Sequence, residues 1–116
     1  MKKIYVSHSN TNKETERRDT VAFCKYVREC GELPIAPCIY LSTVFGEENA
    51  DRGFSDTARL LLLLSCDELW YFGDSITREI TDEICFAMNK GKRVRYITRN
   101  MFERYVETTE VHNEKV

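Results

Sequence analysis

The chain has 116 residues, of which 42% are hydrophobic, and its formal net charge is −2 with acidic and basic residues interspersed. This length allows one domain with one core and is too short for two, and the lack of a basic excess argues against duplex nucleic acid as a partner. The longest apolar run, residues 60–64, is far shorter than the roughly 18 residues that a membrane span needs, and the N-terminus lacks the apolar core of a signal peptide, so we expect a cytoplasmic protein without a membrane partner.

The first third of the chain predicts a strand followed by a loop and a helix. Residues 3–7 (KIYVS) are apolar and β-branched, as in a short strand, and the polar run at 8–12 predicts a loop after it. Apolar residues then recur at three- and four-residue spacing over about 14–30, which predicts a helix, and Gly31 is a typical helix end.

The middle of the chain predicts a second strand and a second helix. Residues 33–39 (LPIAPCI) are apolar, and Pro37 should stand at the end of this strand because proline cannot donate to a sheet. A loop is expected over 42–48. A helix should begin at about residue 49 or 51 and end at Ser65, and its five leucines cover every side, which predicts that it is enclosed within the domain.

The last third predicts a strand, a helix and another strand. Residues 67–72 (DELWYF) form the third expected strand, and its Trp70 should pack in the core. Asp74 or Ser75 could cap the following helix, which should run to Asn89. Residues 93–98 (RVRYIT) then predict a fourth strand.

The alternation of strands and helices predicts an α/β fold. It indicates a three-layer α/β/α, Rossmann-like (flavodoxin-like) sandwich with a mostly parallel sheet of four to five strands. We expect a single domain over 1–116, with its core at about 3–98 and a tail at 99–116 that forms a short helix and a frayed end. The odd number of cysteines, none in a CxxC pair, predicts reduced core thiols rather than disulfides or metal ligands.

Glu83 is the most unusual residue of the pattern. An apolar stripe runs along the third helix through Ile76, Ile80, Ile84 and Ala87, and Glu83 falls within that stripe. A charge on an inward face is costly unless it is used, so Glu83 is a candidate nucleophile or general base. The alternative is a structural salt bridge to one of three arginines: Arg78, Arg93 or Arg95.

Other candidates follow from the rule that open parallel sheets bind ligands beyond the carboxyl ends of their strands. Ser7, His8, Ser9 and Asn10 could bind a sugar or a phosphate, or could form an ordinary polar turn. Tyr5 could position Glu83 or a substrate through its hydroxyl, or could be a packed ring.

The turn before the third helix offers a further set of candidates. Gly73, Asp74 and Ser75 could place backbone N–H groups or a carboxylate against an anion or a ribose hydroxyl, and Asp74 could equally cap the helix.

Several of these segments together resemble the nucleoside 2-deoxyribosyltransferase-like superfamily, and in particular a small uncharacterised bacterial and phage branch of it. The resemblance covers about residues 3–97 and is carried by four segments: IYVS, PIAP, CDELWYFGDSITREITDEICFA and GKRVRYI. It implies that Glu83 is the nucleophile, that Tyr5 takes the place of a tyrosine at the end of the first strand, and that Asp56 is the nearest substitute for an aspartate of the family.

The resemblance also implies a function. The expected activity is binding of a nucleoside or nucleotide with cleavage or exchange of its N-glycosidic bond through a glycosyl ester on Glu83, without a metal or redox cofactor, in a homodimer. Two alternatives stay open from the sequence: binding of a nucleotide signal without turnover, and a protein-interaction or inhibitor module of mobile-element or phage type.

Overall fold

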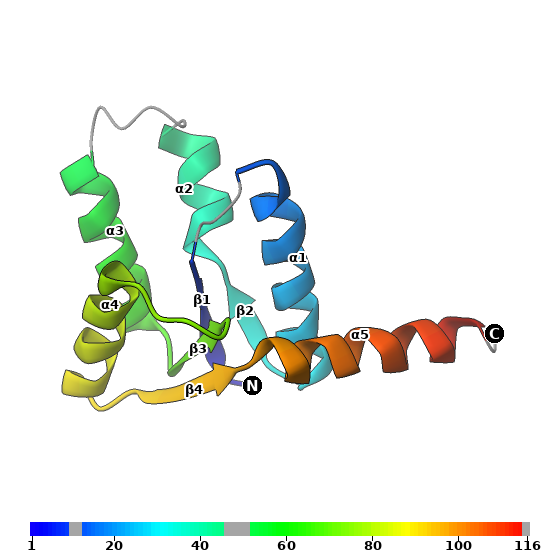
Figure 1. Cartoon of the computed structure of the whole chain (residues 1–116). Coiled ribbons are helices and arrows are strands. Elements are labelled where there is room, and N and C mark those ends of the chain that lie inside the picture. Colours follow the sequence, from blue (N-terminus) through cyan, green and yellow to red (C-terminus); the bar gives the residue numbers. More distant parts are fainter. Residues whose placement is uncertain (10–12, 46–51, 115–116) are drawn as a thin grey trace.

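The computed structural model describes residues 1–9, 13–45 and 52–114, and within these ranges four strands form one parallel sheet (Figure 1). The elements in chain order are β1 (Lys3–His8), α1 (Lys13–Glu29), β2 (Leu33–Ile35), α2 (Pro37–Phe45), α3 (Arg52–Ser65), β3 (Glu68–Phe72), α4 (Arg78–Asn89), β4 (Arg93–Ile97) and α5 (Arg99–Glu114). The strand order β2-β1-β3-β4 is that of a flavodoxin-like sheet, which confirms the predicted fold class.

Helices cover both faces of this sheet (Figure 1). Tyr5, Leu69 and Tyr71 face the side covered by α3 and α4, where they pack in one apolar cluster. Their neighbours along the strands face the other side, where Phe23 of α1 and Phe102 of α5 pack against them. The central strands β1 and β3 are therefore buried on both faces, which explains why the sequence reads there as continuous apolar runs.

The second strand is shorter than the sequence predicted. It ends at Ile35, and Pro37 begins helix α2 instead of closing the strand. Proline suits the first position of a helix because the N–H that it lacks has no partner there and its φ angle is already close to helical. Residues 42–45 of the expected loop belong to α2, and residues 46–48 lie outside the described ranges.

The prediction that the leucine-rich helix is enclosed was wrong. α3 lies in an outer layer, so only one side of it packs against the sheet. Leu63 is completely buried, whereas Leu60, Leu61 and Leu64 are exposed. At about 100° per residue, five consecutive leucines cannot all face one sheet.

Helix α4 begins later than predicted. Its cap is Thr77, whose Oγ1 accepts a hydrogen bond of 3.4 Å from the Ile80 N–H. Ile76 therefore precedes the helix and is 49% exposed, so it is not part of the inward stripe. Ile80, Ile84 and Ala87 do face the core, and the predicted end is confirmed by Gly91 with a φ of 72°.

Two further expectations are corrected at the surface. The tail is a helix of 16 residues, α5, whose first turns pack on the sheet through Phe102. Among the cysteines, Cys66 is buried, but Cys30 and Cys85 are exposed and are therefore not core thiols. All five are free. Within the described ranges, no helix is both long enough and apolar enough to cross a membrane.

Candidate functional site

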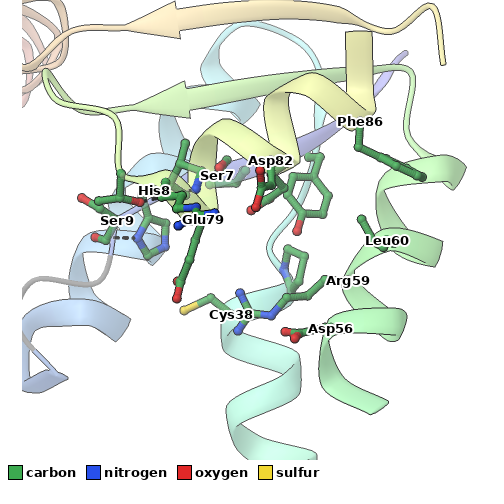
Figure 2. Close-up of a pocket in the computed structure, with 17 residues that line it drawn as sticks. Ser7, His8, Ser9, Cys38, Asp56, Arg59, Leu60, Glu79, Asp82 and Phe86 are labelled. Atoms are coloured by element: carbon green, nitrogen blue, oxygen red, sulfur yellow. Dashed lines mark hydrogen bonds between the residues drawn. The ribbon is translucent and has the colours of Figure 1, made fainter. Parts of the chain in front are cut away.

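A pocket of about 980 Å³ lies at the carboxyl end of β1, beside the point where the strand order reverses between β1 and β3. This volume is typical of small-molecule sites. Its walls come from the end of β1 and from α2, α3 and α4 (Figure 2). The predicted site residues that line it are Tyr5, Ser7, His8, Ser9, Asp56 and Glu83.

Among the acidic residues that line this pocket, Glu83 is the one that is partly buried. It follows the buried Ile80 by one turn of α4 and is itself only partly exposed. Burial raises the pKa of the Glu83 carboxyl, while the nearby Tyr5 hydroxyl, the Arg59 guanidinium and the Ser7 hydroxyl act in the opposite direction. None of the three arginines considered from the sequence forms a salt bridge with it in the described structure.

Tyr5 combines the two roles that the sequence left open. Its ring is 2% exposed and packs in the cluster beneath α3 and α4. Burial and the neighbouring Glu83 carboxylate raise the pKa of its hydroxyl far above the ordinary value. The hydroxyl therefore stays protonated at neutral pH and can only donate toward Glu83, which holds that carboxylate in place.

Ser7 places a polar group in the pocket wall for which the described residues provide no hydrogen-bond partner. The residue is 3% exposed, and its Oγ makes no hydrogen bond within the described part of the chain, although it lies near enough to Glu83 to favour the charged carboxylate. Buried hydroxyls are nearly always hydrogen-bonded in proteins. An unpaired one that lines a pocket is available to a ligand.

His8 is held by a hydrogen-bond network that the sequence did not predict. The Thr20 hydroxyl lies 2.7 Å from the Glu16 carbonyl oxygen and 2.8 Å from Nε2 of His8. Because the hydroxyl has one proton and the carbonyl can only accept, Thr20 donates to Glu16 and can accept from Nε2 when that nitrogen carries a proton. Burial lowers the pKa of His8, which favours the neutral ring, and its Nδ1 lies 3.4 Å from the Ser9 carbonyl oxygen, which can only accept. A neutral ring has one N–H, so it donates either to Ser9 from Nδ1 or to Thr20 from Nε2.

Cys38 joins the same network on the pocket side. Its Sγ donates to a Glu16 carboxylate oxygen at 2.7 Å, and burial together with this carboxylate raises the pKa of the thiol to about 11. The thiol is thus protonated and is a poor nucleophile. Cys38 follows the second strand, so the rule that ligands bind beyond strand ends could have identified it from the sequence. No local sequence pattern marks Glu16 or Thr20 as site residues.

The charged groups of the pocket divide into an inner and an outer set. Arg59 and Glu83 are partly buried, whereas the remaining charged side chains of the lining, Asp56, Arg78, Glu79 and Asp82, are exposed. Figure 2 shows Asp56 and Arg59 projecting from α3 on the side opposite the β1 end. Arg59 was not predicted as a site residue, because an arginine on a leucine-rich helix carries no local signal of a ligand.

The turn after β3 lies apart from the pocket lining. Gly73 N–H donates to the Ile97 carbonyl at 3.1 Å, and Asp74 accepts from the Arg99 N–H at 3.0 Å. The carbonyl of Ser75 accepts from the Tyr71 hydroxyl. Gly73, Asp74 and Ser75 thus connect β3 to β4 and α5, and Asp74 does not cap α4. Asn10, the remaining predicted binding residue, lies outside the described ranges.

No group of three or more histidine, cysteine, aspartate or glutamate side chains suited to a metal ion occurs among the residues that the structure describes. The polar groups that line the described pocket include a carboxyl group, hydroxyl groups, an imidazole, a thiol and a guanidinium.

Solved structures similar to this chain share its fold. A 2-deoxyribosyltransferase from the psychrotolerant bacterium Bacillus psychrosaccharolyticus, described as a biocatalyst for the synthesis of antiviral and antitumoral nucleosides, matches with a TM-score of 0.64 and 19% identity over 83% of this chain and 72% of its own. A 2-deoxyribosyltransferase from Leishmania mexicana matches with a TM-score of 0.64 and 12% identity over 84% of this chain and 65% of its own. The nucleoside 2-deoxyribosyltransferase-like fold expected from the sequence is thereby confirmed.

Two other comparisons concern the sequence. A model of a protein family described as a domain of unknown function (DUF7768) matches residues 2–97. No sequence among the curated proteins matches the chain.

Proposed function

Because this chain belongs to the DUF7768 family and has a 2-deoxyribosyltransferase-like fold, we propose that it binds a nucleoside or nucleotide in the pocket beside Glu83 and cleaves the N-glycosidic bond. One observation carries the proposal. The half-buried carboxyl of Glu83 lies next to the protonated Tyr5 hydroxyl and the unpaired Ser7 hydroxyl, at the strand end where such sheets bind ligands.

The proposed reaction uses these groups in order. A Glu83 oxygen attacks C1′ of the sugar, the bond from C1′ to the base nitrogen breaks, and its electron pair leaves with the base, which takes a proton from water or from an acid at the pocket edge. Water or a second base then attacks C1′ and releases the Glu83 carboxylate. Tyr5 donates to the carboxylate and orients it, and Ser7 offers its hydroxyl to the sugar.

By the resemblance, Asp56 is the nearest substitute for the family's aspartate and would have to act as the acid, and its position favours a second candidate function. It lines the pocket but is exposed, on the helical turn before Arg59. An exposed carboxyl is poorly placed to protonate a leaving base. Binding of a nucleotide without turnover is therefore the alternative to catalysis.

The expected homodimer and cytoplasmic location stay predictions.

The proposal is tested by two measurements on the wild-type protein. A panel of nucleosides and nucleotides should contain at least one that raises the melting temperature, since a ligand at about 100 times its dissociation constant stabilises a protein by about 2.7 kcal/mol. Chromatography should then detect free base from that ligand. Stabilisation without base release supports the binding function. The absence of stabilisation by any of them contradicts both and favours a protein-interaction module.

The substitution Ser7→Ala should have opposite effects on folding and on binding. Removing a buried hydroxyl without a partner should leave the free energy of unfolding unchanged or raise it, because no hydrogen bond is lost. Ligand affinity should fall about five- to tenfold, as for one lost hydrogen bond. Denaturant unfolding and calorimetric titration of the same preparations measure the two effects. A large loss of stability with unchanged affinity would show that the hydroxyl serves the fold.

A further inference from the structure

Arg59 carries a positive charge in the pocket, and none of the residues that the structure describes neutralises it by direct contact. The residue lies on α3, lines the pocket and is partly buried. Figure 2 shows its guanidinium inside the pocket, toward Cys38 and Asp56. Within the described ranges it forms neither a hydrogen bond nor a salt bridge.

The guanidinium acts on several pocket groups at longer range. Its charge favours the ionised form of Glu83, and it also influences the Tyr5, His8 and Cys38 side chains. These four groups come from three different elements, and all of them line the same pocket as Arg59. The only carboxyl among them, Glu83, is too far away for a salt bridge.

A cation in this position is costly without an anion. Partial burial removes some of the water that would solvate the guanidinium, and its five N–H donors are left without protein acceptors in the described structure. The acidic groups Asp56, Glu79 and Asp82 are exposed, so solvent screens their repulsion of a bound anion. The inner part of the pocket therefore contains an unpaired cation with room beside it for a ligand.

We propose that the pocket takes a phosphorylated nucleoside, and that Arg59 binds its phosphate. This inference rests on the proposed function and adds the class of substrate. The planar guanidinium can make two parallel hydrogen bonds to phosphate oxygens, a geometry that is stronger and more selective than contact with a neutral sugar hydroxyl. The Ser7 hydroxyl, unpaired in the same pocket, is available to the sugar or to a phosphate oxygen.

The test compares affinities by calorimetric titration at low ionic strength. The ligands are deoxynucleosides, their 5′- and 3′-monophosphates, and inorganic phosphate. For the wild type, at least one monophosphate should bind ten times or more tightly than its nucleoside, as expected for hydrogen bonds to a charged group. The two isomers show which sugar hydroxyl carries the phosphate.

Arg59→Gln should remove this preference. Affinity for the monophosphate should fall about 10- to 100-fold, while affinity for the nucleoside should change less than about threefold. Arg59→Lys keeps the charge without the planar donors and should retain part of the preference. The matched control is Arg18→Gln, which removes an equal charge from an exposed position on α1 outside the pocket and should preserve the preference.

Two results would overturn the inference while leaving the proposed function intact: equal wild-type affinity for nucleoside and monophosphate, or an equal loss of both in Arg59→Gln. Failure of every ligand that carries a base, with or without binding of inorganic phosphate, would contradict the proposed function and this inference together. Unfolding midpoints show whether Arg59→Gln folds, and Arg59→Lys provides the comparison if it does not.

Discussion

Glu83→Gln is expected to reduce release of the base by at least about 10³-fold, because the amide cannot form the glycosyl ester on which the proposed reaction depends. Ligand binding should persist, since glutamine has nearly the same shape and can still accept from Tyr5. Single-turnover base release and calorimetric titration measure the two properties. Glu103→Gln is the control, because it removes an exposed carboxylate on α5 far along the chain from the pocket residues.

The same variant should become more stable than the wild type as the pH rises. Burial raises the pKa of Glu83 in the folded protein above its unfolded value, so the folded state binds the proton more tightly. The stabilising contribution of the protonated form is complete below the unfolded pKa and is lost as the pH rises through the folded pKa. Urea unfolding of both proteins from pH 4 to 8 should show the difference growing in favour of Glu83→Gln.

Together these measurements separate catalysis from folding. Lost activity with equal or greater stability assigns Glu83 to the chemistry. If Glu83→Gln releases base as fast as the wild type, Glu83 is not the nucleophile. If the stability of Glu83→Gln relative to the wild type is lower at neutral pH than at acidic pH, the carboxylate supports the fold.

Leu63→Ala should produce the largest loss of stability among single leucine substitutions on α3. Leu63 is completely buried beneath that helix, in the cluster that includes Tyr5 and Leu69. Truncation leaves a cavity and should lower the free energy of unfolding by about 2–5 kcal/mol, which corresponds to a fall in melting temperature of about 10 °C or more. Denaturant and thermal unfolding followed by circular dichroism measure both values.

Leu61→Ala is the matched control on the same helix. Leu61 is 62% exposed, so its truncation should change the free energy of unfolding by no more than about 0.5 kcal/mol. Equal losses in the two variants would mean that α3 is covered on its outer side in solution, as the sequence-based prediction of an enclosed helix requires.

The sequence predicted the order and type of most elements because their signals are local. The apolar runs of β1 and β3 and the glycine at the end of α4 are readable within a few residues. Pro37 was misassigned because an apolar segment with a proline suits both a strand end and a first helical turn. Ile76 was assigned to α4 because the cap at Thr77 competes with two equally suitable capping residues before it.

Part of the site was also predictable. Glu83 was found because it interrupts the apolar face of its own helix, and Tyr5 and Ser7 because β1 ends where parallel sheets bind ligands. Other members depend on distant residues. The contact of Thr20 with His8 depends on how α1 packs against the end of β1, and the position of Arg59 depends on how α3 lies across the sheet.

The sequence by itself thus determined the α/β alternation, the buried central strands and the inward position of Glu83, because each depends on the backbone periodicity of one element. Only the tertiary structure decided that Thr20 contacts the His8 ring, that the Ser7 hydroxyl has no described partner and that Arg59 enters the pocket. Hydrogen bonds and charge effects act over a few ångströms between residues far apart in the chain, and only the packing of helices on the sheet brings those residues together.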